Sequence, residues 1–368
     1  MAFRDNAARF RDWGRDSIGS LRDWARRRWM YRKGFSFGSG GASATEAGSS
    51  GTGFLDRLNQ PGLWGIVWRA LVAIVVVLLL YYPIGMLMVN RIDDDPDFVP
   101  SAADAAPQGG SKAVAVMAAL IDREVNVNSW TANDPFFQPG SLLDNMPNFQ
   151  TGIVSALARF SFEMTDQVGR TRGSSEADPD LQKAAGLLQY PADVWIWNPT
   201  VSLAPRASTE SQYRQARKAL LKYNARLAAG NATFERRADN LMATIDRMSS
   251  DLGSQSAILD DEVREHSGDF IDMNADDVFY ATKGKLYGYY MLLKALGEDF
   301  APVIKEKGLD KNWAQMLDTF REGATLAPLI VINGRPDSLF QPSHLAAQGF
   351  YLLRARTQLR EISNVLLK

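Results

Sequence analysis

The chain has 368 residues, no cysteine and a formal net charge of −1. The absence of cysteine excludes disulfides, thiolate metal sites and cysteine nucleophiles. The charge is unevenly distributed, because residues 1–69 hold 12 Lys and Arg against 6 Asp and Glu, whereas the remainder holds 29 against 36. A net-acidic C-terminal region argues against nucleic acid as its partner.

Residues 1–33 form a basic segment whose apolar residues fall on one face at 100° per residue, which predicts an amphipathic helix. An internal repeat at residues 10–15 and 21–26 has a period of 11 residues, which keeps that face in register. We expect this helix to lie on the anionic cytoplasmic leaflet of a membrane, and a helix bound to a protein partner or a disordered basic arm are the alternatives. The residues that we assign to the membrane surface are Phe10, Trp13, Leu21, Trp24, Arg26, Arg27, Arg28 and Trp29.

Residues 34–62 are rich in glycine and serine and predict a flexible linker. The next segment, residues 70–89, contains no charged residue, and as a helix it would cover about 30 Å, the thickness of the hydrocarbon core. We therefore predict a transmembrane helix over residues 63–90; a buried core helix and a cleaved signal peptide are the alternatives. Trp64, Trp68, Tyr81 and Tyr82 are placed as interfacial aromatic residues. The positions assigned to the span are Ala70, Val76, Leu80, Pro83 and Val89.

The orientation of this span follows from the charges on either side of it. Lys and Arg are concentrated before it, whereas Asp93, Asp94, Asp95 and Asp97 follow it. The positive-inside rule then predicts a cytoplasmic N-terminus and a C-terminal region on the outer side of the membrane. Residues 91–110, rich in Asp, Pro and Ala, are interpreted as a second linker.

The periodicity of residues 111–368 is helical, and Ser111 is a candidate N-cap for the first helix. The predicted fold is mainly α, with a single N-terminal transmembrane helix followed by an α-helical extracytoplasmic domain with helical hairpins. We expect helices 208–229 and 233–265 to form one such hairpin around Gly230–Asn231. Residues 193–197 and 329–332 are interpreted as short strands or buried extended segments. Further helices are expected at residues 151–168, 276–297, 311–325 and 343–366.

The last predicted helix, residues 343–366, begins after Ser343, a second candidate N-cap. It repeats leucine every seven residues. This stripe is typical of ordinary core packing, and a seam for homo-oligomers through the C-terminal helix is the alternative. The leucines are Leu345, Leu352, Leu359 and Leu366.

No metal or cofactor site is predicted. The acidic run at residues 269–277 resembles a calcium loop, but Asp277 stands where such a loop needs glycine and Lys283 where it needs glutamate. We expect Asn274 or Asp276 to cap the following helix instead. The two histidines, His266 and His344, are far apart and have no metal-ligand spacing.

Two sets of residues are candidates for function. Glu163, with Asp134 or Asp166, could supply the two carboxylates of a glycan hydrolase, although solvated or ion-paired acids are the simpler interpretation. Aromatic residues could stack on sugars or form a partner surface, although core packing is the simpler interpretation here too. The aromatic sets are Tyr190, Trp195 and Trp197, and Tyr280, Tyr287, Tyr289 and Tyr290.

Residues 180–199, DLQKAAGLLQYPADVWIWNP, and 202–214, SLAPRASTESQYR, follow a single predicted span. In this layout the chain resembles an uncharacterised family of bacterial membrane proteins, domain of unknown function 2333, over roughly residues 65–368. The resemblance implies a Gram-negative inner-membrane protein with a periplasmic domain. It implies no activity and no functional residues.

The function that we expect is that of a membrane-anchored, non-enzymatic cell-envelope protein, a periplasmic scaffold or interaction domain tethered to the inner membrane. Its expected partners are the lipid bilayer and an envelope protein or the cell wall. Two alternatives stay open: a carboxylate-based hydrolase of cell-wall glycan, and a lipid-sensing or membrane-bending protein acting through residues 1–33.

Overall fold

The computed structural model describes residues 62–168, 177–202, 204–268, 272 and 274–368. The predictions for residues 1–33 and for residues 34–61 therefore lie outside the described residues. The chain divides into two units, residues 1–69 and residues 70–368. The helical bundle belongs to the second unit, whereas the first turns of helix α3 belong to the first.

Helix α3, Leu63–Val89, is long and apolar enough to cross a membrane. The most apolar 18-residue window of its apolar stretch, Trp64–Val89, has a mean hydropathy of 2.6, and none of that window is buried by the rest of the described chain. Pro83 lies inside the helix without ending it. The predicted span therefore corresponds to one helix without a buried residue in its most apolar part, and the five residues assigned to it all lie within that helix.

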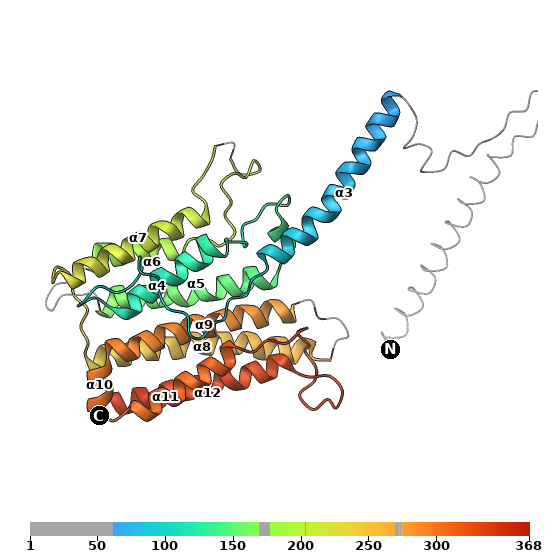
Figure 1. Ribbon diagram of the computed structural model, residues 1–368. Helices are drawn as coiled ribbons and strands as arrows, with labels where there is room; N and C mark the ends of the chain where they lie inside the picture. The colour runs from blue at the N-terminus through green and yellow to red at the C-terminus, as the bar shows by residue number, and fades with distance from the viewer. Residues whose placement is uncertain (1–61, 169–176, 203, 269–271, 273) are drawn as a thin grey trace, which may run out of the picture. The chain divides into compact units, whose positions relative to one another are not determined.

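The remaining described residues form helices and connections, without a strand. Asn333 and Ser343 make one isolated β-bridge. Figure 1 shows the long helices lying side by side, and a mainly α fold is confirmed. The helices are α4 (Lys112–Asp122), α5 (Asn145–Glu163), α6 (Pro179–Leu188), α7 (Thr209–Ala228), α8 (Ala238–His266), α9 (Ala275–Asp299), α10 (Ala301–Glu306), α11 (Asp310–Ala324) and α12 (His344–Leu366). A π-turn, Arg123–Val127, continues α4; another, Met164–Val168, continues α5; and a 3₁₀ turn, Pro139–Leu142, precedes α5.

Helix α9 lies at the centre of the bundle and packs against α5, α11 and α4. Residues of α9 are buried on all sides of the helix. For this reason its apolar and small residues are distributed around the whole helix and do not form a single stripe. The helix comes especially close to α5. A Cβ on Gly284 would overlap the carbonyl oxygen of Phe149, and a Cβ on Gly152 would overlap that of Ala281.

The N-terminus of α4 is fixed by polar contacts with distant residues. The Oγ of Ser111 accepts a hydrogen bond from the backbone N–H of Val114, as its predicted role as N-cap requires. Asp299, at the end of α9, accepts hydrogen bonds from the Ser111 hydroxyl at 2.7 Å and from the backbone N–H of Ala113 at 3.0 Å. The carboxylate therefore compensates the positive end of α4 and ties α4 to α9.

The other predicted caps are only partly correct. Asn274 occupies the N-cap position of α9, but Asp272 accepts the hydrogen bonds from the N–H groups of Asn274 and Ala275. Ser343 occupies the N-cap position of α12, but its hydroxyl makes no capping bond.

The predicted hairpin of residues 208–229 and 233–265 is wrong. Helices α7 and α8 occupy these segments, but α7 packs against α6 and α4, whereas α8 packs against α12 and α9. The turn at Gly230 is present, with φ of +75°. A local turn signal fixes where a helix ends, but the apolar faces of the two helices decide which neighbours they choose. The hairpins between consecutive helices include α6–α7 and α11–α12.

The two predicted extended segments are not strands. In residues 193–197 only Val194 is buried. In residues 329–332, Leu329 is 99% exposed and Ile330 is 69% exposed. Both segments are connections, α6–α7 and α11–α12, and the prolines that bound them favour irregular backbone over a paired strand.

Candidate functional site: the juxtamembrane clamp

The segment that follows α3 is fixed to the helical domain by three buried side chains and one that is partly exposed. Because α3 is long and apolar enough to cross a membrane, we call residues 93–98 the juxtamembrane segment. The four residues that hold this segment, Arg123, Lys283, Tyr287 and Lys294, are called the clamp. Three of the four come from α9 and one from the π-turn after α4. The composition of this segment predicts that it is part of a linker. The clamp residues lie far away in the chain, so the local sequence does not indicate these contacts.

Arg123 is the clamp residue that comes from the π-turn after α4. Its side chain is only 4% exposed, and its guanidinium lies 3.4 Å from the carboxylate of Asp93. The same guanidinium donates a hydrogen bond to the hydroxyl of Tyr287 at 2.7 Å and lies over the ring of Phe98. One buried cation therefore contacts both ends of the juxtamembrane segment and the centre of α9.

Glu124 balances the charge of Arg123 from the domain side. It is fully buried, and its carboxylate accepts a hydrogen bond from Arg123 at 2.7 Å. Burial raises the pKa of the Glu124 carboxyl, and the guanidinium of Arg123 opposes this shift. Gln150, also fully buried, donates to both the carboxylate and the backbone carbonyl of Glu124. A buried charge pair needs such additional hydrogen bonds because it has lost its hydration.

Lys283 and Tyr287 hold the middle of the segment. The ammonium of Lys283 lies 2.6 Å from the carboxylate of Asp94 and donates to the carbonyl of Leu326 at 2.7 Å. The hydroxyl of Tyr287 donates to the carbonyl of Asp95 at 2.7 Å. Lysine is rarely buried without a partner, so these two acceptors account for its position inside the bundle.

Lys294, about two turns further along α9 than Tyr287, holds the end of the segment. Its ammonium donates to the carbonyl of Pro96 at 2.9 Å and lies 3.7 Å from the carboxylate of Asp97. This outer pair is exposed and contributes little energy by itself. The clamp pairs three cations with Asp93, Asp94 and Asp97 of the acidic run that follows α3, and these contacts attach the run to the domain.

A groove between α5 and the α6–α7 connection is the second candidate site. It has a volume of about 560 Å³ and is open on one side. Asp251 lies at the groove, where it accepts a hydrogen bond from Tyr289 at 2.8 Å and pairs with Lys285 at 3.1 Å. Both contacts are made to the same oxygen of Asp251, Oδ2, and the rest of the groove is lined mainly by apolar surface, with Arg159 at its wall. The other wall residues include Val154, Ala158, Phe162, Leu188, Tyr190 and Tyr213.

The carboxylates considered for glycan cleavage do not form a facing pair. Glu163 is the last residue of α5, whereas Asp134 lies in the connection that precedes α5, next to Gly140 and near Glu210. Glu163 is 3% exposed and accepts a hydrogen bond from Arg247 at 3.2 Å. Burial raises its pKa, and Arg247 opposes the shift. Asp166 lies near Glu163, one turn along, but neither residue lines the groove.

The aromatic candidates separate into core and surface. Tyr287 and Tyr289 are fully buried and Tyr290 almost so, as core packing predicts. Tyr190 lines the groove and donates to the carbonyl of Ala207. Trp195 and Trp197 lie further along the same connection, where Trp195 packs edge-on against Phe137 and Trp197 is 47% exposed.

The acidic residues before α9 act as structural groups in the described part of the chain. Asp272 caps α9 and also accepts a hydrogen bond from Asn333 at 2.8 Å. Asp277 accepts one from Asn148 at 2.6 Å. Asp269 lies outside the described residues. Among those described, no three His, Cys, Asp or Glu residues are placed to hold a metal ion.

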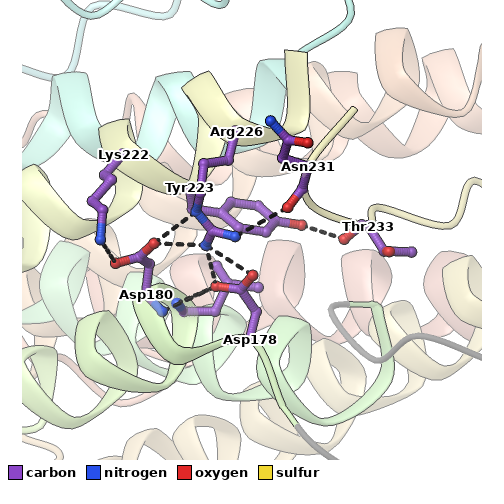
Figure 2. A network of polar contacts seen from close by, with 8 residues as sticks. Asp178, Asp180, Lys222, Tyr223, Arg226, Asn231 and Thr233 are labelled. Carbon is purple, nitrogen blue, oxygen red and sulfur yellow. Dashed lines mark hydrogen bonds and ion pairs between the residues drawn. The ribbon is translucent and has the colours of Figure 1, made fainter. Parts of the chain in front are cut away.

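A network of ion pairs between α6 and α7 has no counterpart among the sequence-based predictions (Figure 2). Arg226 on α7 donates to Asp178 at 2.7 Å and to Asp180 at 2.6 Å, and Lys222 pairs with Asp180 at 3.0 Å. Asp178 also caps α6, with Pro179 in the first turn. The pair Asp178–Pro179 is a helix-start signal that could have revealed α6 from the sequence. The network closes a structural hairpin.

Fold and site together define an α-helical bundle attached to an apolar helix that could span a membrane. The model of the family described as "uncharacterized protein conserved in bacteria (DUF2333)" matches residues 62–274 and 262–368. The chain belongs to this bacterial family, as its resemblance at residues 180–214 implies. No curated protein and no solved structure matches the chain.

Proposed function

We propose that this protein is a single-pass protein of the bacterial inner membrane whose periplasmic helical domain acts as a non-enzymatic scaffold held directly at the membrane. The observation that carries the proposal is the combination of α3 with the clamp. No residue in the most apolar part of α3 is buried by the rest of the described chain, and the segment that follows it is bound to the domain by Arg123, Lys283 and Tyr287.

The orientation rests on charge. The basic residues that precede α3 favour the cytoplasm, whereas the acidic juxtamembrane segment favours the outer side. The clamp adds a reason for Asp93 and Asp94 that is independent of topology, because they pair with the buried cations Arg123 and Lys283. The bilayer and an envelope protein or the cell wall are the proposed partners, and homo-oligomers are a further proposal. The leucine stripe of the last helix is buried inside the domain, so homo-oligomers would have to form through other faces. The stripe consists of Leu345, Leu352, Leu359 and Leu366.

The chain has no cysteine, so single cysteines can report topology in the full-length protein. In intact spheroplasts, we expect a membrane-impermeant maleimide to react with Lys368→Cys and to react with Arg15→Cys only after lysis. The protein should also stay in the membrane pellet after alkaline carbonate extraction. A shortened, extractable product would show instead that α3 is a cleaved signal sequence, and the reverse labelling pattern would contradict the orientation.

The scaffold role is tested against the hydrolase with cell-wall sacculi. The detergent-solubilised full chain is incubated with sacculi, and both co-sedimentation and release of soluble fragments are measured. Sedimentation without release supports a wall-binding scaffold. If neither occurs, cross-linking in intact cells should yield a discrete adduct with an envelope protein. Release that Glu163→Gln abolishes, while the fold is kept, would overturn the proposal in favour of a glycan hydrolase.

A further inference from the structure

Two connections at one end of the bundle are unusual in composition. The α4–α5 connection contains no charged residue over residues 135–143, and the α6–α7 connection contains none over residues 194–205. Both carry large apolar side chains that point into solvent. Phe136 is 84% exposed. The exposed set, which we call the apolar loop patch, is Phe136, Phe137, Leu142, Ile196, Trp197 and Val201.

The two connections form one surface. The ring of Phe137 packs edge-on against that of Trp195, with centroids 5.5 Å apart. Behind them, the indole N–H of Trp130 donates to the carbonyl of Ala192 at 2.9 Å, and Asn133 donates to the carbonyl of Val194 at 2.9 Å. These contacts hold the loops in place from inside, so that their apolar residues are presented outward and are not folded into the core.

Helix α3 contacts this surface within its apolar stretch. The hydroxyl of Tyr82 donates to the carbonyl of Phe136 at 2.7 Å, and that of Tyr81 donates to the carbonyl of Phe137 at 3.2 Å. One turn further on, Gly85 lies so close to Pro139 that a Cβ there would overlap the ring. The apolar surface of α3 therefore continues without a break onto the α4–α5 connection.

The spacing of aromatic residues along α3 gives the level of this contact. Trp64 and Tyr82 are 18 residues apart, which is about 27 Å along a helix and close to the thickness of the hydrocarbon core. Because Trp and Tyr prefer the two membrane interfaces, Tyr82 marks the outer one. The loop that accepts its hydrogen bond lies at the same level.

We infer that the apolar loop patch inserts into the outer leaflet of the membrane that α3 spans, so that the domain has a second, monotopic contact with lipid. This inference rests on the proposed function, since it requires α3 to be a span. Exposed aromatic and aliphatic side chains, here in two stretches without a charged residue, are the residues that enter the headgroup–acyl boundary. The patch is contiguous with α3, which selects lipid over a protein as its occupant.

The test uses single cysteines that carry an environment-sensitive fluorophore in the full-length chain, reconstituted in phosphatidylethanolamine–phosphatidylglycerol vesicles. The labelled variants are Phe136→Cys and Trp197→Cys in the patch, Val76→Cys in α3 and Glu306→Cys at the end of α10. The fluorescence of each labelled variant is measured with two quenchers in separate experiments. One is a nitroxide attached to the lipid chains, and the other is iodide in the aqueous phase.

We expect the labels at positions 136 and 197 to lose most of their emission to shallow lipid nitroxides and little to iodide, whereas the label at position 306 behaves in the opposite way. Position 76 reports the span itself. Quenching of position 76 by lipid, with positions 136 and 197 as open to iodide as position 306, would overturn the inference and leave the proposed function standing. Protection of positions 136 and 197 from both quenchers would also overturn it, in favour of a protein that covers the patch. Loss of lipid quenching at position 76 would overturn the proposed function and the inference with it.

Discussion

The ammonium of Lys283, 2% exposed in the middle of the bundle, lies 2.6 Å from the carboxylate of Asp94, only five residues after the end of α3. These two residues are 189 positions apart in the chain. Their contact joins the most buried cation of α9 to the segment that leaves the predicted span, and it has direct consequences for stability.

Replacing Lys283 with methionine keeps the volume of the side chain but removes the cation. We expect Lys283→Met to lower the free energy of unfolding by about 2 kcal/mol, because hydrogen bonds to a charged group are lost while Asp94 can regain water. Hydrogen exchange of the amides of residues 93–98 should rise in step. Lys305→Met, at an exposed position of α10, is the matched control and should change neither quantity. Unchanged exchange at residues 93–98 would show that the clamp does not hold the segment.

The crossing of α5 and α9 makes a second prediction. Because a Cβ on Gly284 would overlap the carbonyl oxygen of Phe149, Gly284→Ala should force the helices apart and destabilise the fold by about 3 kcal/mol. Gly186→Ala is the control, since nothing lies within 4 Å of that position on α6. It should stabilise by up to about 1 kcal/mol through helix propensity. Thermal unfolding followed by circular dichroism measures both, and equal effects would contradict the close crossing.

The network in Figure 2 should make stability depend on acid. Burial alone would raise the pKa of Asp180, but hydrogen bonds from Lys222 and Arg226 outweigh it and hold this pKa below its usual value. The stabilisation is therefore fully present above the unfolded pKa of about 3.9 and is lost as the pH falls through the lower folded pKa.

Arg226→Met should accordingly lower the melting temperature at pH 7, and the difference from the parent protein should shrink below about pH 4. Arg237→Met is the control, because Arg237 pairs with the exposed carboxylate of Asp239 on the surface. A difference that is the same at every pH would mean that Arg226 acts through packing alone.

For Asp134 we predict the opposite pH dependence of stability from that of Asp180. Burial, with a contribution from Glu210, raises its pKa to about 6. The folded state therefore binds a proton that the unfolded state has already released, and stability falls as the pH rises from about 4 through 6.

Asp134→Asn should remove this loss and raise the stability at pH 7.5 by about 1 kcal/mol, a value that allows for the remaining hydration of a half-buried group. At pH 4.5 the change should be small. Asp193→Asn, in the neighbouring connection, is the control. Melting curves at the two pH values measure this difference in stability. A lower stability of Asp134→Asn than of the parent protein at pH 7.5 would contradict the raised pKa.

The elements that could be predicted from the sequence are those with a long, regular apolar pattern. Helix α12 begins within one residue of the predicted 343–366, and α9 within one residue of 276–297, because their periodicity continues through several turns. Helix α6 is absent from the predicted elements because it has only ten residues. The exposed run at residues 329–332 resembles a strand in sequence because β-branched residues in a connection give the same pattern.

The candidate site could not be predicted in the same way. The composition of residues 91–110 is that of a linker, and the cations that bind it, Arg123 and Lys283, lie in otherwise apolar helices. Periodicity shows which face of a helix is buried, but it does not show which distant carboxylate reaches a buried lysine. Of the aromatic residues proposed as a binding surface, Trp197 belongs to the apolar loop patch and Trp195 packs against it, whereas Tyr190 lines the separate groove.

The clamp also determines how far the domain can reach. Asp93 comes four positions after Val89, the end of α3, so the first fixed point lies within about 14 Å of the helix end. A free chain from Val89 to Ser111 would allow the domain to range over about 70 Å. If α3 spans a membrane as we propose, this short connection keeps the domain at the membrane surface, and a second membrane-anchored protein would search for it in two dimensions instead of three.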